Sequence, residues 1–241
     1  MKYAVITGST KGIGKQIAIK LLENGYKVIL NYSSDDVAFE NFCDEYKNFK
    51  DRLYCIKMKL DNYNNSIEFC DKVKEITKKI DVLVLNCGIT EKTEFGFIKD
   101  IEWEKAMNVN LNCPFYIIEN LKDNINNNIG RIILISSVMG KYPHSTSIVY
   151  NVSKAGVIAL SNSLVKYFSD RGITVNTICP GFIKTSYHDN RSKESFDRIN
   201  RRIALHRFGD AEEVANLCFE IINNQYINGS NIDINGGYDY F

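Results

Sequence analysis

A tyrosine and a lysine stand four residues apart in the stretch Tyr150-Asn151-Val152-Ser153-Lys154. In a helix, residues at i and i+4 lie one above the other on the same face, so these two side chains would be neighbours. An ammonium close to a phenol lowers the phenol's pKa from its reference value of about 10, which would let a tyrosine exchange protons nearer neutral pH. The spacing therefore predicts a proton-transfer pair, although by itself it is also that of an ordinary surface pair.

A serine, Ser137, lies thirteen residues before Tyr150 and follows the predicted strand 131–136 directly. Open parallel α/β sheets hold their ligands at the carboxyl ends of the strands. A hydroxyl at that edge could hydrogen-bond a substrate carbonyl, and the alternative is a simple cap at the strand end.

The first predicted strand runs into a glycine-rich turn with the spacing G-x-x-x-G-x-G. Glycines let the backbone turn sharply and approach a pyrophosphate, and the helix that follows offers unpaired N–H groups to the anion. The strand–turn–helix context favours a dinucleotide-binding turn over a purely structural one. Its candidate cofactor-binding residues are Gly8, Ser9, Thr10, Lys11, Gly12, Ile13 and Gly14.

The end of the second predicted strand indicates which dinucleotide is bound. A carboxylate that would bind the ribose 2′-hydroxyl of NAD is expected there, but the sequence reads Asn31-Tyr32-Ser33-Ser34. Asp35 and Asp36 follow, and we predict that they cap the next helix. Lys11 could meet a 2′-phosphate as a point charge. These features favour NADP over NAD; the alternative is that Lys11 is a solvated loop lysine.

Short apolar runs that alternate with longer amphipathic segments supply the elements that would position these residues. Continuous apolar runs such as 132–135 are typical of strands covered on both faces. Three segments carry apolar residues at helical spacing. One begins after Gly14, one contains Ile67, Val73 and Ile76, and one extends from Ile148 to Phe168. The predicted strands are 3–7, 27–31, 53–58, 82–86, 131–136, 174–178 and 231–234. The alternation predicts an α/β protein with a Rossmann-type, doubly wound, seven-stranded parallel sheet flanked by helices, in one domain over residues 1–241.

Composition excludes several classes of protein. The chain has 241 residues, of which 44% are hydrophobic and 24% charged, which is ordinary for a globular protein. Its net charge of +1 argues against a nucleic-acid or membrane-surface binder, and no apolar run reaches the roughly 18 residues that span a bilayer. Seven cysteines without a CxxC pair predict free thiols rather than disulfides or a metal site. We expect a cytoplasmic protein.

Taken together, the motifs resemble those of the short-chain dehydrogenase/reductase family over essentially all 241 residues. The glycine turn, the Tyr-x-x-x-Lys pair and the preceding serine occur in the family's order and spacing. The further matching segments are Asp61 after the third strand, Leu85-Asn86-Cys87-Gly88, Trp103 with Asn110, and Pro180-Gly181-Phe182-Ile183-Lys184-Thr185.

The resemblance implies a catalytic set of four residues. Tyr150 would be the general acid that protonates a carbonyl oxygen, and Ser137 would hold and polarise that oxygen. Lys154 would lower the pKa of Tyr150 and bind the nicotinamide ribose, and Asn110 would hold a water that relays protons to solvent.

The resemblance also implies NADP(H) as the cofactor and adds residues to its site. They are Tyr32, Asp61, Asn86, Gly88, Pro180, Gly181, Ile183 and Thr185, together with Tyr150 and Lys154. Leu85 and Cys87 depart from the family's usual asparagine and alanine. We interpret Cys87 as a small buried residue, with a redox thiol as the alternative.

Three further stretches are Gly130-Arg131-Ile132-Ile133, Gly172-Ile173-Thr174-Val175-Asn176 and Arg207-Phe208-Gly209. In these the chain resembles the bacterial 3-oxoacyl-[acyl-carrier-protein] reductases within the family, which implies reduction of a 3-oxoacyl thioester. The alternatives are a reductase for a sugar or another small ketone in a specialised pathway, and a non-catalytic nucleotide-binding regulator. Arg171 matches one basic position of that group that would meet an acyl carrier protein, but Asn128 stands at the other.

A mobile, basic substrate lid is expected at about residues 184–207. It could attract a phosphopantetheine or another anion, or it could be a solvated amphipathic helix. Its cations are Lys184, Arg191, Lys193, Arg198, Arg201, Arg202 and Arg207. The resemblance further implies a homotetramer, in which a partner subunit or the substrate cleft would cover the aromatic ending 236–241.

Overall fold

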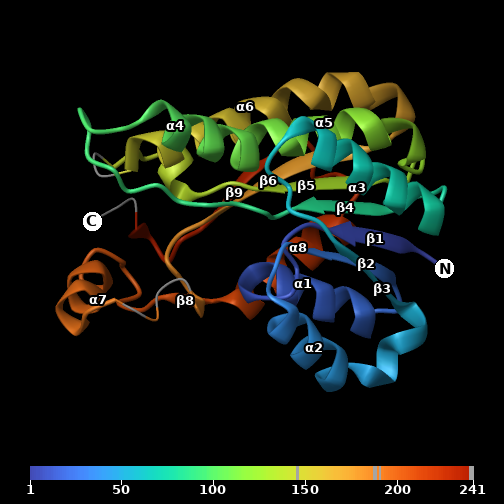
Figure 1. Ribbon diagram of the computed structural model, residues 1–241, viewed down its shortest axis with the longest axis horizontal. Helices are drawn as coiled ribbons and strands as arrows, with labels where there is room; N and C mark the ends of the chain where they lie inside the picture. The colour runs from blue at the N-terminus through green and yellow to red at the C-terminus, as the bar shows by residue number, and fades with distance from the viewer. Residues whose placement is uncertain (145–146, 187–188, 190, 239–241) are drawn as a thin grey trace.

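Seven parallel strands form one sheet in the order β3-β2-β1-β4-β5-β6-β9 (Figure 1). The computed structural model describes residues 1–144, 147–186, 189 and 191–238. The strands are β1 (Tyr3–Ile6), β2 (Lys27–Tyr32), β3 (Leu53–Lys57), β4 (Val82–Leu85), β5 (Arg131–Ile135), β6 (Thr174–Pro180) and β9 (Asn231–Ile234). Each predicted strand begins at the residue expected from the sequence, and the ends differ by at most two residues. The predicted parallel, doubly wound sheet is confirmed.

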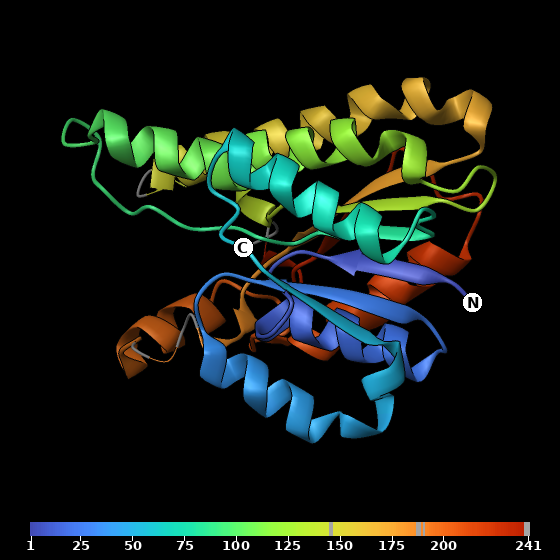
Figure 2. The same ribbon diagram turned by 45° about the vertical axis from the view of Figure 1, so that its right-hand side comes forward.

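Helices cover both faces of the sheet (Figures 1 and 2). One layer holds α1 (Gly12–Glu23), α2 (Asp36–Glu45) and α8 (Ala211–Asn223), and the other holds α3 (Tyr63–Ile76), α4 (Asp100–Met107), α5 (Cys113–Leu121) and α6 (Ile148–Phe168). The helix α7 (Lys193–Asn200) extends beyond the carboxyl edge of the sheet, near the short pair β7 (Ile183–Lys184) and β8 (Gly209–Asp210). Short helical turns are η1 (Lys47–Arg52), η2 (Asn108–Asn112), η3 (Lys122–Asn124), η4 (Val138–Gly140) and η6 (Ser169–Arg171).

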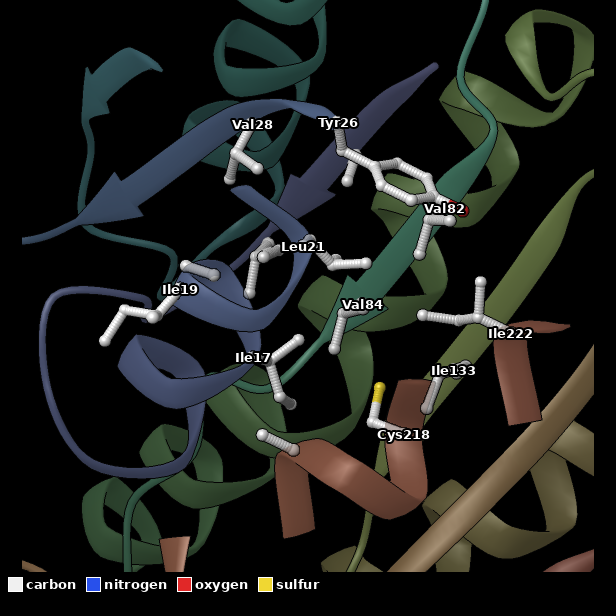
Figure 3. Close-up of a cluster of buried hydrophobic side chains, with 14 of the residues drawn as sticks. Ile17, Ile19, Leu21, Tyr26, Val28, Val82, Val84, Ile133, Cys218 and Ile222 are labelled. Atoms are coloured by element: carbon white, nitrogen blue, oxygen red, sulfur yellow. The ribbon is translucent and has the colours of Figure 1, made fainter. Parts of the chain in front are cut away.

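The apolar strands alternate between two cores because successive side chains of a strand point to opposite faces. In β5, Ile133 and Ile135 pack with α1 and α8, whereas Ile132 and Leu134 pack with the helices of the other layer. Figure 3 shows the first of these cores, with Ile17 of α1 and Cys218 of α8 meeting the strands. The strand coverage on both faces that the apolar runs predicted is confirmed.

The strand order reverses between β1 and β4, because the chain winds outward from β1 to β3 and then returns to β4 on the other side. Ligands of open α/β sheets bind in the crevice outside the carboxyl ends of the strands at such a point. The glycine turn leaves β1 and the Asn86-Cys87-Gly88 segment leaves β4, so the topology brings both predicted motifs to this crevice.

Among the described residues, the stretch Ile148–Arg171, which contains α6, is the one helix that could cross a membrane by length and composition alone. In this fold one face of it packs on the sheet, with Val149, Val157 and Phe168 buried. Its opposite face leaves Val152 42% and Tyr167 56% exposed.

The predicted lid forms α7 and packs through a third apolar cluster. This cluster combines Ile199, Ile203 and Phe208 with Val138 of η4 and with Tyr238, and the Phe196 ring stacks on that of Phe208 at 4.5 Å between centroids. Residues 187, 188 and 190 of the lid, and residues 239–241 of the predicted aromatic ending, lie outside the described part of the chain. The mobility of the lid stays a prediction.

Candidate active site

The glycine turn has a backbone that side chains would obstruct. Gly8 and Gly12 have φ of 62° and 53°, in the left-handed region that favours glycine. Gly14 lies in the first turn of α1, where a Cβ atom would come 2.3 Å from the Gly8 carbonyl oxygen and 2.6 Å from Nδ2 of Asn86. All three glycines are therefore required by the geometry of the turn.

Hydrogen bonds from three polar side chains, those of Thr7, Asn31 and Asn86, fix this turn. Thr7 and Asn31 are not among the cofactor-binding residues expected from the sequence. The side chain of Asn31, which is buried, accepts from the Gly8 N–H at 3.3 Å and donates to the Met58 carbonyl at 2.9 Å. Thr7 accepts through Oγ1 from the Asn86 N–H at 2.9 Å, and Asn86 donates through Nδ2 to the Gly8 carbonyl at 2.8 Å. A polar residue at the end of an apolar strand, as in Leu30-Asn31, is the signal that could have identified Asn31.

The helix α1 starts without a cap. Its N-cap residue, Lys11, makes no side-chain capping hydrogen bond among the described residues, and its first turn holds no acidic residue. By contrast, the side chain of Asp35 caps α2 and that of Asn62 caps α3. The free N–H groups and partial positive charge of an uncapped helix N-terminus suit an anion. The turn and helix therefore fit the pyrophosphate of a dinucleotide.

Lys11 forms an ion pair with Asp35, and both side chains are about half exposed. The hydrogen bond from Lys11 and that from the Ala38 N–H lower the pKa of Asp35. The prediction that Asp35 caps the next helix is confirmed. Tyr32 is buried, stacks on Phe39 and donates its hydroxyl proton to Asp36 at 2.9 Å. The Tyr32 hydroxyl is thus already hydrogen-bonded to the first residue of α2.

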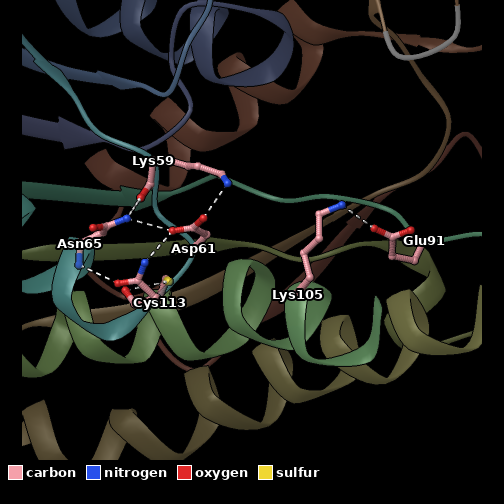
Figure 4. Close-up of polar contacts among 7 residues, drawn as sticks. Lys59, Asp61, Asn65, Glu91, Lys105 and Cys113 are labelled. Atoms are coloured by element: carbon pink, nitrogen blue, oxygen red, sulfur yellow. Dashed lines mark hydrogen bonds and ion pairs between the residues drawn. The ribbon is translucent and has the colours of Figure 1, made fainter. Parts of the chain in front are cut away.

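Asp61 lies between β3 and α3 in a polar network (Figure 4). It pairs with Lys59 at 2.7 Å and accepts from the side-chain amides of Asn62 and Asn65, each at 2.9 Å. Burial would raise the pKa of Asp61, but Lys59 and the two amides lower it overall. A fixed carboxylate here is available for a contact with an adenine ring, which stays a prediction.

The segment after β6 closes over the glycine turn. A Cβ atom at Gly12 would lie 3.1 Å from Cγ2 of Thr185, so the two segments are in contact. Pro180 ends β6, Ile183 is buried in β7, and a Cβ at Gly181 would come 2.8 Å from Asn235. The structure thus brings Thr185, the last residue of the predicted segment 180–185, against the glycine turn.

Lys154 is the buried cation at the centre of the predicted catalytic set. The residue is 4% exposed, and its ammonium donates to the Ile135 carbonyl at 2.8 Å and lies 5.8 Å from the centroid of the Tyr150 ring. Burial lowers the pKa of Lys154 to about 8. The position of Tyr150 and Lys154 at i and i+4 of one helix, which the sequence predicts, is confirmed.

Ser137 begins the turn η4, which it caps by accepting from the Met139 N–H at 3.1 Å. Gly140 at the end of η4 lies against the backbone of α6, since a Cβ there would come 2.8 Å from the Lys154 carbonyl carbon. Ser136 donates through Oγ to the Lys154 carbonyl at 2.8 Å. The strand end and the helix are thereby locked together.

Asn110 ties the loop after β4 to α6. Its side chain accepts from the Ile89 N–H at 2.8 Å and donates to the Ile89 carbonyl and to Oγ of Ser153, each at 2.9 Å. Ser153 in turn donates to the Tyr150 carbonyl at 2.8 Å. Ser153 therefore links Asn110 to the backbone of Tyr150, a contact that the spacing of the motifs did not reveal.

The π-helical turn η2 turns Asn110 inward, and its cause is visible in the sequence. Pro114 is at the start of α5 and has no N–H to give to the carbonyl four residues earlier, which is that of Asn110. The chain makes a wider turn there, in which the Cys113 N–H bonds the Asn108 carbonyl. The carbonyl of Asn110 keeps capacity for another donor, such as the predicted water.

Gly88 lies between these groups. A Cβ there would be 3.2 Å from Nζ of Lys154 and 3.4 Å from Oδ1 of Asn110. The neighbouring Cys87 contacts Oδ1 of Asn31 at 3.6 Å, and burial raises the pKa of its thiol to about 11. A thiol that stays protonated at neutral pH supports a packing role for Cys87 rather than a redox role.

Two regions of basic side chains were predicted to meet an acidic partner. Arg171 donates to Asn127 and to the Ile125 carbonyl, each at 2.9 Å, so most of its guanidinium is engaged within the protein. In the lid segment, Arg207 pairs with Glu213 and Lys184 with Asp210. Lys193, Arg198, Arg201 and Arg202 are exposed as well, and the guanidinium of Arg202 lies 5.3 Å from the centroid of the Tyr238 ring. The described residues contain no group of three or more His, Cys, Asp or Glu that could hold a metal ion.

A family model for short chain dehydrogenases matches residues 2–195 of the chain. Curated relatives include the 3-oxoacyl-[acyl-carrier-protein] reductases FabG of Buchnera aphidicola subsp. Schizaphis graminum and of Aquifex aeolicus. Each is 35% identical to this chain and covers 98% of it and 96% of its own length.

Solved structures show the same fold. A short chain dehydrogenase from Burkholderia cenocepacia J2315 in complex with NADP has a TM-score of 0.92 and 25% identity, covering 99% of this chain and 98% of that one. The RhlG/NADP active-site complex of Pseudomonas aeruginosa has a TM-score of 0.89 and 26% identity, covering 98% and 96% of the two chains.

Proposed function

The chain belongs to the short-chain dehydrogenase family, and from this premise we propose that it is an NADPH-dependent carbonyl reductase that converts a 3-oxoacyl thioester to the 3-hydroxyacyl form. The observation that supports the proposal is the buried Lys154 beside the Tyr150 ring, next to Gly88 in the loop after β4. The bound cofactor would supply a hydride to the carbonyl carbon. The protein would supply the proton and hold the oxygen.

The protein's part in this reaction is proton transfer and orientation. Tyr150 would deliver its phenolic proton to the carbonyl oxygen, and the Ser137 hydroxyl would donate a hydrogen bond to the same oxygen. The charged form of Lys154 favours the phenolate that remains. Asn110 would position Tyr150 through Ser153 and hold the water that returns a proton from solvent.

The same lysine gives the reaction a pH dependence. Because Lys154 has a pKa of about 8, its ammonium is mostly charged at pH 7 and mostly neutral at pH 9. We expect kcat/KM for NADPH to fall about tenfold per pH unit above 8, since this ratio reports the free enzyme. A Lys154→Arg variant stays charged over this range and should lose that limb of the profile. A flat wild-type profile from pH 7 to 10, or the same limb in the variant, would assign the titration to another group.

The preference for NADPH would come from Lys11. The ion pair with Asp35 holds the Lys11 ammonium beside the turn. A bound 2′-phosphate would replace Asp35 as the partner of that ammonium. Lys11→Ala is expected to weaken NADPH binding about tenfold, as for a lost charge-assisted hydrogen bond, with NADH binding changed less than twofold. Asp35→Asn should instead strengthen NADPH binding, because Lys11 is then released. Fluorescence titration of both cofactors measures this, and an equal loss for NADH would refute the 2′-phosphate role.

The acyl thioester is favoured by the surface around the site. The exposed cations of the lid, Arg198, Arg201 and Arg202, suit an anionic carrier or phosphopantetheine. Phe95 and Phe97, in the loop between β4 and α4, are 75% and 73% exposed and offer apolar surface for an acyl chain. The engaged Arg171 and the uncharged Asn128 favour the second candidate, a reductase for a sugar or another small ketone.

The test is NADPH oxidation at 340 nm with acetoacetyl-CoA, with NADH as the paired cofactor and small ketones and keto-sugars as the paired substrates. Rapid, NADPH-specific turnover of the thioester is the expected result. Turnover of a ketone or sugar alone would keep the mechanism and replace the substrate. Cofactor binding without turnover of any substrate would favour a nucleotide-binding regulator.

We also propose a cytoplasmic homotetramer. The apolar outer face of α6, with Val152 and Tyr167 exposed, is a surface that a second copy of the chain would cover. The C-terminal segment would form the other interface.

A further inference from the structure

A cavity of about 200 Å³ lies at the amino ends of the strands, on the opposite edge of the sheet from the candidate active site. Its titratable lining residues are Lys2 before β1, Tyr26 before β2, Asp81 before β4 and Arg131 at the start of β5, and the amide side chains of Asn223 and Gln225 complete the polar lining. None of these residues takes part in the proposed reaction.

Arg131 is a buried cation without an anionic partner. Its side chain belongs to a residue that is 4% exposed; Nε donates to the Ile222 carbonyl at 3.1 Å and Nη1 to the Gly130 carbonyl at 2.8 Å. No carboxylate of the described residues forms an ion pair with it, and its Nη2 makes no hydrogen bond there. Burial lowers the pKa of Arg131, which reflects the unfavourable desolvation of an unpaired charge.

Tyr26 adds a second unused donor. The residue is 5% exposed, yet its hydroxyl makes no hydrogen bond to any part of the chain that the structure describes. Figure 3 shows the ring reaching from the start of β2 toward Val82, with Ile222 nearby. The hydroxyl oxygen itself is not sealed from solvent, so it faces the cavity as a donor that a bound oxyanion can use.

The charge balance of the cavity is positive. Lys2 extends over it, with Nζ 5.7 Å from the centroid of the Tyr26 ring. The carboxylate of Asp81 is already engaged, since its two oxygens accept from the Tyr3 N–H and from Nδ2 of Asn126, each at 2.6 Å. Because both donors are neutral, Asp81 keeps its negative charge, and together with Lys2 and Arg131 it leaves the lining with a net formal charge of +1. The groups that can still donate to a ligand are Lys2, Tyr26 and Nη2 of Arg131.

We propose that Lys2, Tyr26 and Arg131 form a binding site for a phosphate group, as free phosphate or a phosphate monoester. The three donors come from separate elements around one cavity, which suits an oxyanion whose oxygens point in several directions. A guanidinium with a free nitrogen and a mobile ammonium are the side chains that commonly bind phosphate. The site is independent of the proposed function, because it shares no residue with the cofactor crevice.

The test is calorimetric titration of inorganic phosphate into the full-length protein saturated with NADP⁺, which occupies the phosphate-binding turn. One phosphate per chain is expected. Tyr26→Phe removes only the hydroxyl and should weaken binding about tenfold, as for a hydrogen bond to a charged group. Lys2→Met should weaken it about threefold. The matched control is Lys27→Met, which removes a neighbouring lysine outside the cavity whose Nζ lies 5.2 Å from the Tyr3 ring centroid, and it should leave the affinity within twofold.

Two further ligands, glycerol 3-phosphate and malonate, distinguish a site for free phosphate from a site for a phosphate monoester or a carboxylate. Glycerol 3-phosphate binding more tightly than inorganic phosphate would support a monoester as the ligand. Malonate binding as tightly as phosphate at equal ionic strength would overturn the assignment in favour of a carboxylate. Absence of binding, or equal affinity in wild type and Tyr26→Phe, would refute the site. A failure here leaves the reductase proposal untouched, because that proposal is tested by NADPH oxidation.

Discussion

Tyr150→Phe is expected to lower the turnover of the reductase by about 10²–10⁴-fold, the range that general acid catalysis typically supplies. The substitution removes the phenolic oxygen and keeps the ring that lies beside the Lys154 ammonium. Because the glycine turn and the start of α1 do not involve Tyr150, NADPH affinity should change less than threefold. Stopped-flow reduction with saturating cofactor and a separate fluorescence titration of NADPH measure the two quantities.

Tyr167→Phe is the matched control, since Tyr167 lies on the same helix and is 56% exposed. It should retain full turnover. If Tyr150→Phe kept more than a tenth of the wild-type rate, the proton would have to come from another group. If turnover and cofactor binding fell together, the role assigned to Tyr150 would be wrong.

The second large effect is expected for Gly14→Ala. The new methyl would meet the Gly8 carbonyl oxygen at 2.3 Å, and backbone at that position cannot withdraw without opening the turn. Overpacking of this kind costs about 3 kcal/mol, which for a domain of this size lowers Tm by roughly 6–12 °C. NADPH affinity should fall at least about tenfold, because the displaced N–H groups no longer converge on the anion.

Gly156→Ala in α6 provides the comparison, since it is also a helical glycine. Its methyl would approach the end of the Leu111 side chain at 2.7 Å, and that side chain can change rotamer. Thermal denaturation should show a small change in Tm and unaltered NADPH binding. Equal losses in the two variants would mean that general helix packing, rather than the cofactor turn, decides the effect of Gly14→Ala.

Local patterns were sufficient to predict the sheet and the order of the motifs. The apolar runs of β4 and β5 are readable because a strand buried on both faces needs a nearly uninterrupted apolar stretch, whereas the edge strand β9 alternates as Asn-Ile-Asp-Ile. The i,i+4 relation of Tyr150 and Lys154 and the cap at Asp35 depend on neighbouring residues, so they too are readable from the sequence. The predicted lid mobility and homotetramer involve motion and a second chain, and they stay predictions.

The hydrogen-bond partners that fix the site residues in position depend on the tertiary structure alone. Asn31 and Gly8 are 23 residues apart, Lys154 and Ile135 are 19 apart, and Ser153 and Asn110 are 43 apart in the chain. The burial that lowers the pKa of Lys154 and the cavity around Tyr26 and Arg131 likewise arise from elements distant in sequence. A sequence pattern records which side chains share a face of one element, whereas desolvation and hydrogen-bond partners depend on how separate elements pack together.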